Sequence, residues 1–328
     1  MVDNDGMVQD RGTSEVTNMV DVSILIVCYK VRHLIAQCLE GIYRHTSGCT
    51  YEVLLVDCSN DGTVDLVRSE FPAVRCIDNA ENLGFGRGNN LLAQHANGRY
   101  LLLLNPDTIV SDNAIGCLYS TAQDFPKAGA IGGRSKLPSG ARDLGCRQVI
   151  PTLSRIAISA VGGASLISGW LPEEADEARE VETLHGAFMM VSADAWAAVE
   201  GFDPSFFMYS EEMDLCHRLR MLGYSIVMTP HAEIVHLVGS GKQFDARRQQ
   251  LIAQARMHFL RKHWSPLASF IGACLLWLHA FVRYSAGIMG SKLAMKRRAQ
   301  ELRECYEGIV LRPSRWWWGF RPDAQTQP

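Results

Sequence analysis

The sequence LLLLNPDT at residues 101–108 decides the fold class, because an unbroken apolar run stops there at a single carboxylate. Four consecutive leucines without polar alternation indicate a strand buried on both faces of a parallel sheet. Open sheets of this kind bind ligands just beyond the carboxyl ends of their strands. The sequence therefore predicts that Asp107 lies at the edge where chemistry takes place.

Predicted strands and helices alternate in front of this run. Apolar strands are expected at residues 22–27, 51–56 and 74–77, and helices at residues 62–71 and 87–96. A further helix is indicated by apolar residues with helical spacing at positions 34, 35, 38, 39, 42 and 43. This order predicts an α/β fold in which helices flank a mostly parallel sheet with right-handed crossovers.

Composition limits the class of protein. The 328 residues are 47% hydrophobic and 20% charged, which is enough for one large or two modest domains. A net charge of −3 provides no basic field for a nucleic-acid partner. Ten scattered cysteines without a CxxC motif indicate a reduced, cytoplasmic protein. Residues 1–19 are polar and aperiodic, and we expect them to form a disordered leader.

Two loops carry residues suited to a nucleotide. Asp57 follows a strand and is placed to accept a hydrogen bond from a base or ribose; the alternative is a turn at Asp61-Gly62, with Asp57 capping the next helix. The segment NLGFGRGNN at residues 82–90 packs three glycines around Arg87, so backbone amides there could approach a phosphate. It does not match the dinucleotide-binding fingerprint.

An acidic cluster opens a later helix that ends near residue 223. Glu211, Glu212 and Asp214 crowd its first turn, and their repulsion tends to raise the pKa of one of them, while the helix N-terminus opposes this. The alternative is an acidic helix start with a surface ion pair between Asp214 and Arg218. The apolar and aromatic residues 206–209 precede these acids directly. They indicate that the acids emerge from an apolar surface and do not lie on an open face.

The ordered motifs resemble those of family 2 glycosyltransferases with the GT-A fold, in the bacterial rhamnosyltransferase-like branch. The resemblance covers roughly residues 22–241 and rests on VSILIVCYK, YEVLLVDCSNDG, NLGFGRGNN, YLLLLNPDT, HGAFMMV, GFDPSFFMYSEEMDLCHR and AEIVH. It implies inverting transfer from a nucleoside diphosphate sugar. It further implies that Tyr29 and Asp57 contact the nucleoside, Asp107 and His236 lie at a metal, and Glu212 is the base.

This resemblance completes the predicted site. Where the family's metal motif often has two aspartates, this chain offers Asn105 and Asp107, so Mg²⁺ or Mn²⁺ would take further ligands from the diphosphate. Glu211 and Asp214 are expected to support Glu212 or to contact the acceptor. The predicted donor site also contains Asn82, Gly84, Arg87, Asn89 and Asn105. The predicted acceptor site contains His185, Gly186 and Tyr209, although His185 could equally be a strand-edge residue.

Residues 242–328 change to long helical segments, expected at residues 245–263 and 267–295. Residues 267–282 are apolar but too few for a confident transmembrane helix. A basic tail with tryptophans at 316–318 predicts an interfacial region on the cytoplasmic face of the cell membrane. The alternative is a helical hairpin packed on the catalytic domain, or a contact with a second copy of the chain.

Together these features predict a metal-dependent enzyme that transfers rhamnose from dTDP-rhamnose to a lipid-linked saccharide acceptor in cell-surface polysaccharide synthesis. The donor rests on the resemblance alone. The alternatives are a transferase that uses a UDP-hexose and a non-catalytic scaffold of the same fold at the membrane. Asn105 in place of a carboxylate favours the scaffold, whereas Asp107, Glu212 and His236 favour an enzyme.

Overall fold

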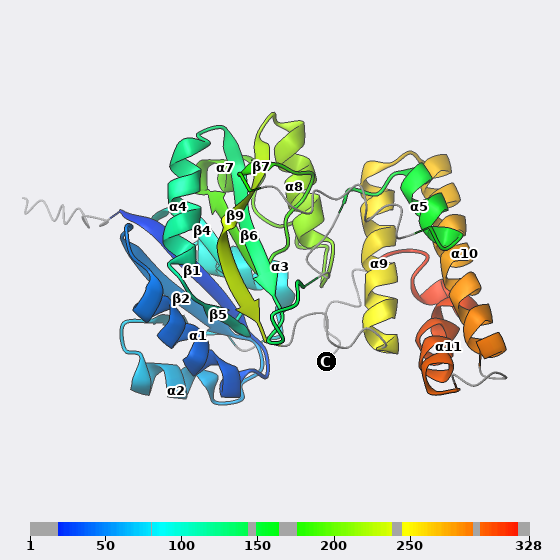
Figure 1. Cartoon of the computed structure of the whole chain (residues 1–328), viewed down its shortest axis with the longest axis horizontal. Helices are drawn as coiled ribbons and strands as arrows, with labels where there is room; N and C mark the ends of the chain where they lie inside the picture. The colour runs from blue at the N-terminus through cyan, green and yellow to red at the C-terminus, as the bar shows by residue number, and fades with distance from the viewer. Residues whose placement is uncertain are drawn as a thin grey trace, which may run out of the picture.

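The computed structural model describes residues 19–79, 81–143, 149–163, 176–237, 245–290 and 296–320. A mixed sheet flanked by helices forms one part of the molecule, and a group of helices lies beside it (Figure 1). Residues 1–18 of the predicted leader and the predicted boundary at residue 241 lie outside the described ranges.

The first half of the sheet is parallel, as the alternating pattern predicts. Its elements, in chain order, are β1 (Val20–Cys28), α1 (Arg32–His45), β2 (Tyr51–Asp57), α2 (Thr63–Glu70), β3 (Arg75–Ile77), α3 (Gly84–Ala93) and β4 (Gly98–Leu104). Strand β1 pairs in parallel with both β2 and β4, and β2 pairs in parallel with β3. The carboxyl ends of these four strands therefore meet at one edge.

The second half makes the sheet mixed. It consists of β5 (Thr108–Val110), α4 (Ala114–Asp124), β6 (Ala128–Lys136), α5 (Leu153–Ala160), β7 (Arg179–Glu180), β8 (Phe188–Ser192), α7 (Ala193–Ala198), α8 (Glu211–Met221) and β9 (Ser225–His236). The strand order is β3-β2-β1-β4-β8-β6-β9-β5, with β7 paired to β9. Strand β8 is antiparallel to both β4 and β6, whereas β6 pairs in parallel with β9, so the sheet is mixed beyond β4.

The leucine run is buried on both faces, as predicted. Leu102 and Leu104 pack into a core with α1 and α4, whereas Leu101 and Leu103 pack into a second core with α3, α7 and α8. None of the four side chains is more than 4% exposed. Successive strand residues point to opposite faces, so a strand covered on both sides must be apolar throughout.

The C-terminal helices pack together as a third cluster. They are α9 (Ala246–His263), α10 (Pro266–Gly290), α11 (Lys296–Leu311) and the short 3₁₀ helix η2 (Pro313–Arg315). Helix α5, from the middle of the chain, joins this group and contacts α10 (Figure 1). Trp316 is fully buried in the cluster, which agrees with the alternative in which tryptophans form part of a helical core. Trp318, in contrast, is 51% exposed.

Candidate active site

The end of β4 and the end of β9 bring the two predicted metal ligands together. Strand β5 follows Asp107 directly and runs antiparallel to β9, with Thr108 opposite His236. The backbone amide of Leu237 donates to the Asp107 carbonyl oxygen at 2.8 Å. This pairing leaves His236 Nε2 3.2 Å from Asp107 Oδ1. The two residues are 129 positions apart in the sequence, and the sheet makes them neighbours.

A third residue, Asp143, completes this arrangement and was missed by the sequence analysis. Its Oδ2 lies 3.1 Å from His236 Nδ1, and its carboxylate is buried. A metal-binding histidine usually donates its second ring N–H to such a carboxylate, which directs the other nitrogen at the metal. Asp143 lies in a segment without a recognisable motif, so nothing in the sequence distinguished it from a surface aspartate.

The donor atoms of Asp107 and His236 fit a divalent cation. When Nδ1 donates to Asp143, Nε2 presents a lone pair to a carboxylate oxygen 3.2 Å away, and two such acceptors need a positive charge between them. Their spacing is close to the roughly 3 Å between adjacent ligands of an octahedral ion with bonds of about 2.1 Å. Within the described ranges, no group of three or more His, Cys, Asp or Glu side chains forms a metal site. Remaining ligands would therefore come from phosphate oxygens and water.

The buried acids of α8 lie next to the predicted acceptor residues. A methyl group built at Gly186 would lie 3.9 Å from Glu212 Cβ, and one built at Gly86 would lie 3.9 Å from Glu211 Cβ. The rings of His185 and His236 have centroids 6.2 Å apart. The loop at residues 185–186 therefore lies between the predicted metal ligands Asp107 and His236 and the acids of α8.

Both glutamates of α8 are buried, and the pKa of Glu211 is shifted. Glu211 and Glu212 are only 4% and 5% exposed, so the predicted apolar surroundings of the acids are confirmed. Burial raises the pKa of Glu211 well above its usual range, and the adjacent Glu212 carboxylate raises it further. The raised pKa expected within the acidic cluster thus falls on Glu211.

We expect Glu211→Gln to raise the melting temperature, and to raise it more as the pH increases from about 5 to 8. The folded protein holds the Glu211 proton above its normal pKa while the unfolded chain releases it, so the wild type loses stability as pH rises in this window. Glutamine imitates the protonated acid and removes that dependence. Thermal melts of both proteins across this range test the expectation, and parallel melting curves at every pH would contradict it.

The predicted nucleoside residues lie at the same edge of the sheet. Cys28 and Asp57 are register partners at the ends of β1 and β2, and Tyr29, which follows β1, is 39% exposed. Asp57 Oδ1 accepts hydrogen bonds from the Ser59 amide at 3.0 Å and its hydroxyl at 2.7 Å. Asp57 therefore shapes its own loop and does not cap α2.

The turn expected at Asp61-Gly62 is present. Asp61 Oδ1 accepts a hydrogen bond from the Thr63 amide at 3.1 Å, at the first residue of α2. Gly62 has a φ of +84°, a left-handed conformation that glycine adopts without steric cost. The alternative interpretation was therefore correct that this loop contains a turn at Asp61-Gly62. It was wrong that Asp57 caps α2.

The glycine-rich segment lies inside α3, since that helix begins at Gly84 and not at residue 87 as predicted. A methyl group at Gly84 would lie 2.5 Å from the Phe207 carbonyl oxygen, and one at Gly88 would lie 2.8 Å from the Val27 side chain. These glycines let α3 pack closely against β1 and the loop before α8. Asn82 Oδ1 accepts from the Gly84 amide at 3.2 Å.

The other predicted donor residues have local roles of their own. Asn89 Nδ2 donates to the Phe85 carbonyl at 2.9 Å, and its buried Oδ1 has no partner. Arg87 is half-buried on α3. The backbone amide of Asn105 donates to the Ala187 carbonyl at 3.1 Å, which ties the end of β4 to the loop before β8. Donor binding by these residues stays a prediction.

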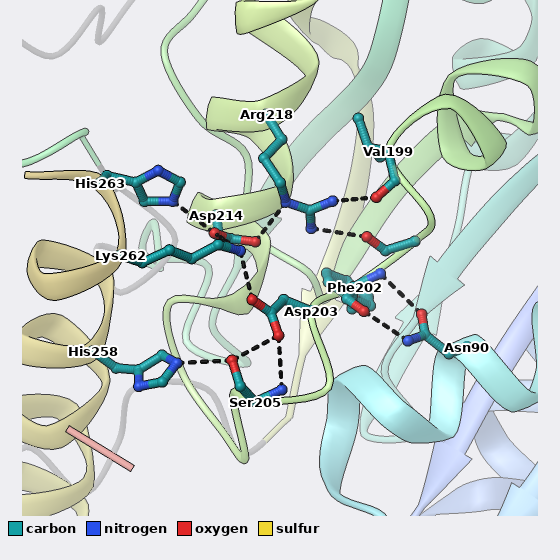
Figure 2. A network of polar contacts seen from close by, with 11 residues as sticks. Asn90, Val199, Phe202, Asp203, Ser205, Asp214, Arg218, His258, Lys262 and His263 are labelled. Atoms are coloured by element: carbon teal, nitrogen blue, oxygen red, sulfur yellow. Dashed lines mark hydrogen bonds and ion pairs between the residues drawn. The ribbon is translucent and has the colours of Figure 1, made fainter. Parts of the chain in front are cut away.

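Asp214 is surrounded by cations in the interior, so the alternative of an exposed ion pair is wrong (Figure 2). Its carboxylate lies 2.7 Å from Arg218 Nε, 2.7 Å from Lys262 Nζ and 2.7 Å from His263 Nε2. Burial alone would raise its pKa, but the His263 hydrogen bond and the charges of Arg218 and Lys262 outweigh burial and lower the pKa to about 2. Asp214 thus fastens α8 to α9.

Further contacts join α9 to the loop that precedes α8. Lys262 also pairs with Asp203 at 2.6 Å, and Ser205 Oγ lies 2.8 Å from His258 Nε2 (Figure 2). Tyr209, predicted to contact the acceptor, has a left-handed φ of 68° and stacks with Arg248 of α9 at 6.0 Å. The loop that leads into the acids of α8 is therefore held by the C-terminal helices.

Residues 20–256 match the family model described as glycosyltransferase-like family 2. This chain belongs to that family. The matched region extends beyond residue 241 and includes most of α9. Lys262 and His263, which hold Asp214, lie at the end of α9, beyond the matched region.

Two bacterial rhamnosyltransferases are similar in sequence to this glycosyltransferase. The N-acetylglucosaminyl-diphospho-decaprenol L-rhamnosyltransferase of Mycobacterium tuberculosis is 32% identical over 202 residues, which are 56% of this chain and 66% of the relative. The rhamnosyltransferase WbbL of Escherichia coli K12 is 29% identical over 163 residues, 47% of this chain and 60% of the relative. The chain thus spans slightly less than two thirds of these relatives' lengths.

Solved structures with a similar fold include a mannosyltransferase from Pyrobaculum calidifontis in complex with GDP-mannose and Mn²⁺. It has a TM-score of 0.58 and 16% identity, with 92% of this chain and 88% of that chain covered. GalNAc-T7 in complex with UDP, GalNAc and Mn²⁺ has a TM-score of 0.54 and 13% identity, with 90% and 57% covered. At these identities the likeness shows the fold alone, and that fold is GT-A as predicted.

Proposed function

We propose that this glycosyltransferase moves rhamnose from dTDP-rhamnose to a lipid-linked saccharide acceptor, with inversion at the anomeric carbon, during cell-surface polysaccharide synthesis. The observation that carries the proposal is the convergence of Asp107, His236 and Glu212 beside the carboxyl ends of the sheet strands. The names of the two bacterial relatives favour rhamnose as the sugar, and one names a decaprenol-linked acceptor.

Two tasks fall to the residues of the site. Glu212 accepts the proton of the acceptor hydroxyl as that oxygen attacks the sugar. Asp107 and His236 would hold Mg²⁺ or Mn²⁺, and a bound cation there offsets the charge that develops on the diphosphate leaving group. Asp143 acts through His236 by fixing the direction of its ring. Tyr29 and Asp57 position the nucleoside.

A lipid-linked acceptor would favour a position for the enzyme at the cytoplasmic face of the cell membrane. One helix among the described residues, α10, is long and apolar enough to cross a bilayer by length and composition alone. We propose that α10 lies at the membrane surface and does not cross the bilayer. Helices α5 and α11 pack along it, and the buried Trp316 fixes the segment after α11 to the same helical group. A second copy of the chain as a partner remains a prediction of the sequence.

The test is nucleotide release from a panel of nucleotide sugars, with purified protein in detergent, added Mg²⁺ or Mn²⁺, and a lipid-linked saccharide acceptor. Release from dTDP-rhamnose that stops with a chelator and returns with metal is the expected result. Release from a UDP-hexose alone would establish the alternative donor. Nucleotide binding without turnover of any donor would favour the non-catalytic scaffold.

We expect Asp143→Asn to raise the metal concentration needed for half-maximal activity about 10–100-fold, the usual effect of losing a carboxylate behind a metal-binding histidine. Asparagine keeps the shape of the side chain but loses the charge that orients His236. Metal titration of nucleotide release measures the change. Asp203→Asn is a matched control, because that carboxylate pairs with Lys262 in the α9 junction, and its metal requirement should match that of the wild type.

A further inference from the structure

Helix α10 lies at the outer flank of the helical group (Figure 1), and it carries a stripe of exposed, uncharged apolar side chains. Positions 267, 274, 281 and 288 are seven residues apart, close to two helical turns, so they and the exposed residues beside them share one face of the helix. The exposed side chains of this stripe are Leu267, Phe270, Ile271, Cys274, Phe281, Val282, Ile288 and Met289. A continuous exposed apolar surface of this kind marks an interaction site.

A cavity of about 480 Å³ opens within this stripe, in the size range of small-molecule sites. It is lined by Cys274, Trp277, Pro313, Ser314, Trp317 and Trp318. Trp317 contacts Phe270 of the stripe at a ring distance of 5.9 Å, and Trp277 stacks on Phe281 at 5.1 Å. The cavity and the stripe therefore form one apolar surface.

Hydrogen bonds hold the walls of the cavity in place. Trp277 Nε1 donates to the Val310 carbonyl at 3.2 Å, and Trp316 Nε1 donates to the Ile309 carbonyl at 2.9 Å. Because Trp316 is fully buried, it fixes the turn that presents Trp317 and Trp318. These bonds fix the Trp277 ring and the turn that leads to Trp317, whereas Trp318 is 51% exposed.

Exposed arginines adjoin the cavity. Arg312 precedes the two lining residues Pro313 and Ser314, and Arg315 follows them. Arg261 of α9 stacks on Trp318 at 5.0 Å. An apolar chamber with guanidinium groups beside it fits a ligand that has an apolar chain and an anionic phosphate end. The next residues of α9, Lys262 and His263, hold Asp214 on the catalytic side.

We propose that this cavity, which we call the Trp277–Trp318 pocket, binds part of the isoprenoid chain of the polyprenyl-diphosphate acceptor. The inference rests on the proposed lipid-linked acceptor and adds where its chain is held. Broad aromatic walls suit a methyl-branched isoprenoid chain, and the arginines suit its phosphates. Since α9 contacts both the pocket and Asp214, binding of the chain would hold the acceptor in a fixed relation to the helix of Glu212.

Binding can be measured without any sugar transfer, because Cys274 lines the pocket and, among the cysteines that the structure describes, is the exposed one. The full-length protein in detergent is alkylated with a maleimide, with or without a polyprenyl phosphate, and each cysteine is followed by mass spectrometry. We expect the polyprenyl phosphate to slow alkylation of Cys274 at least about tenfold, and the partly buried Cys49, Cys76 and Cys117 to react at unchanged rates.

Two other probes decide the source of the apolar chain. Phospholipid with straight acyl chains, at the same concentration, should protect Cys274 far less than the polyprenyl phosphate. Equal protection by both would overturn the proposal and assign the pocket to the bilayer. Lack of protection by either would also overturn it. Neither result depends on transferase activity, so failure of the pocket and failure of the proposed function can be told apart.

A filled pocket tests the consequence for the reaction. Cys274→Trp should raise the KM for a polyprenyl-linked acceptor about tenfold or more, and should leave kcat and the KM for a short-chain acceptor with the same saccharide unchanged. Met289→Trp, at the far end of the same stripe and outside the pocket, should leave both acceptors unaffected. Equal effects of the two substitutions would overturn a specific pocket.

Discussion

Glu212→Gln should lower kcat for sugar transfer about 10²–10⁴-fold, the range that positioned general bases contribute. Glutamine occupies nearly the same volume but cannot accept the proton of the acceptor hydroxyl. Binding of the nucleotide should be unchanged, because the predicted nucleoside residues Tyr29 and Asp57 lie at the ends of β1 and β2. Steady-state kinetics together with nucleotide titration test both statements.

Glu211→Gln is the matched control for this experiment. The two glutamates are adjacent and equally buried, but burial and the Glu212 charge raise the pKa of Glu211, so a neutral side chain is already its normal state. We therefore expect Glu211→Gln to reduce kcat much less than Glu212→Gln. If the two substitutions had reversed effects, Glu211 would be the base and Glu212 its support.

Asp214→Asn should lower the free energy of unfolding by about 3 kcal/mol, at the lower end of the range for removing one partner of a buried ion pair. The carboxylate is fully buried, and its loss leaves Lys262, Arg218 and His263 without their shared anion. The lower end applies because Lys262 and Arg218 are themselves 28% and 20% exposed. Urea unfolding measures the change.

A surface ion pair gives the comparison. Glu301 pairs with Arg297 at 3.2 Å, but these side chains are 40% and 95% exposed, so Glu301→Gln should change stability by less than about 1 kcal/mol. A similarly small effect of Asp214→Asn would mean that water screens the buried cluster. Loss of the Asp214 carboxylate should also weaken the attachment of α8 to α9. The transfer activity of the Asp214→Asn variant should therefore disappear at a lower temperature than that of the wild type.

The contribution of Asp214 to the free energy of unfolding should decrease at low pH. Its pKa in the folded protein is about 2, below the usual value of 3.8, so the contribution is complete above pH 4 and disappears as the pH falls towards 2. A shift of this size corresponds to about 2 kcal/mol. The difference between the wild type and Asp214→Asn should therefore narrow over this interval, and a constant difference would show that charge is not the cause.

Local patterns were enough to predict the first half of the fold. The strands and helices up to Leu104 follow from apolar periodicity, and the alternation of strand and helix predicts their parallel pairing correctly. The antiparallel position of β8 between β4 and β6 was not predicted. Pairing between strands that are distant in the sequence depends on the tertiary packing of the whole sheet, and local patterns do not show it. The short strand β5, which places Asp107 opposite His236, was missed for the same reason.

The sequence by itself determined the leucine strand that ends at Asp107, the acids that open α8 and the resemblance to the family, since each depends on neighbouring residues. Tertiary structure alone decided that Asp143 orients His236, that Asp214 is enclosed by cations of α9, and that Glu211 is the glutamate with the raised pKa. The physical reason is that burial and ion pairing arise from residues far apart in the chain, and only folding determines which charges share a site and which lose their water.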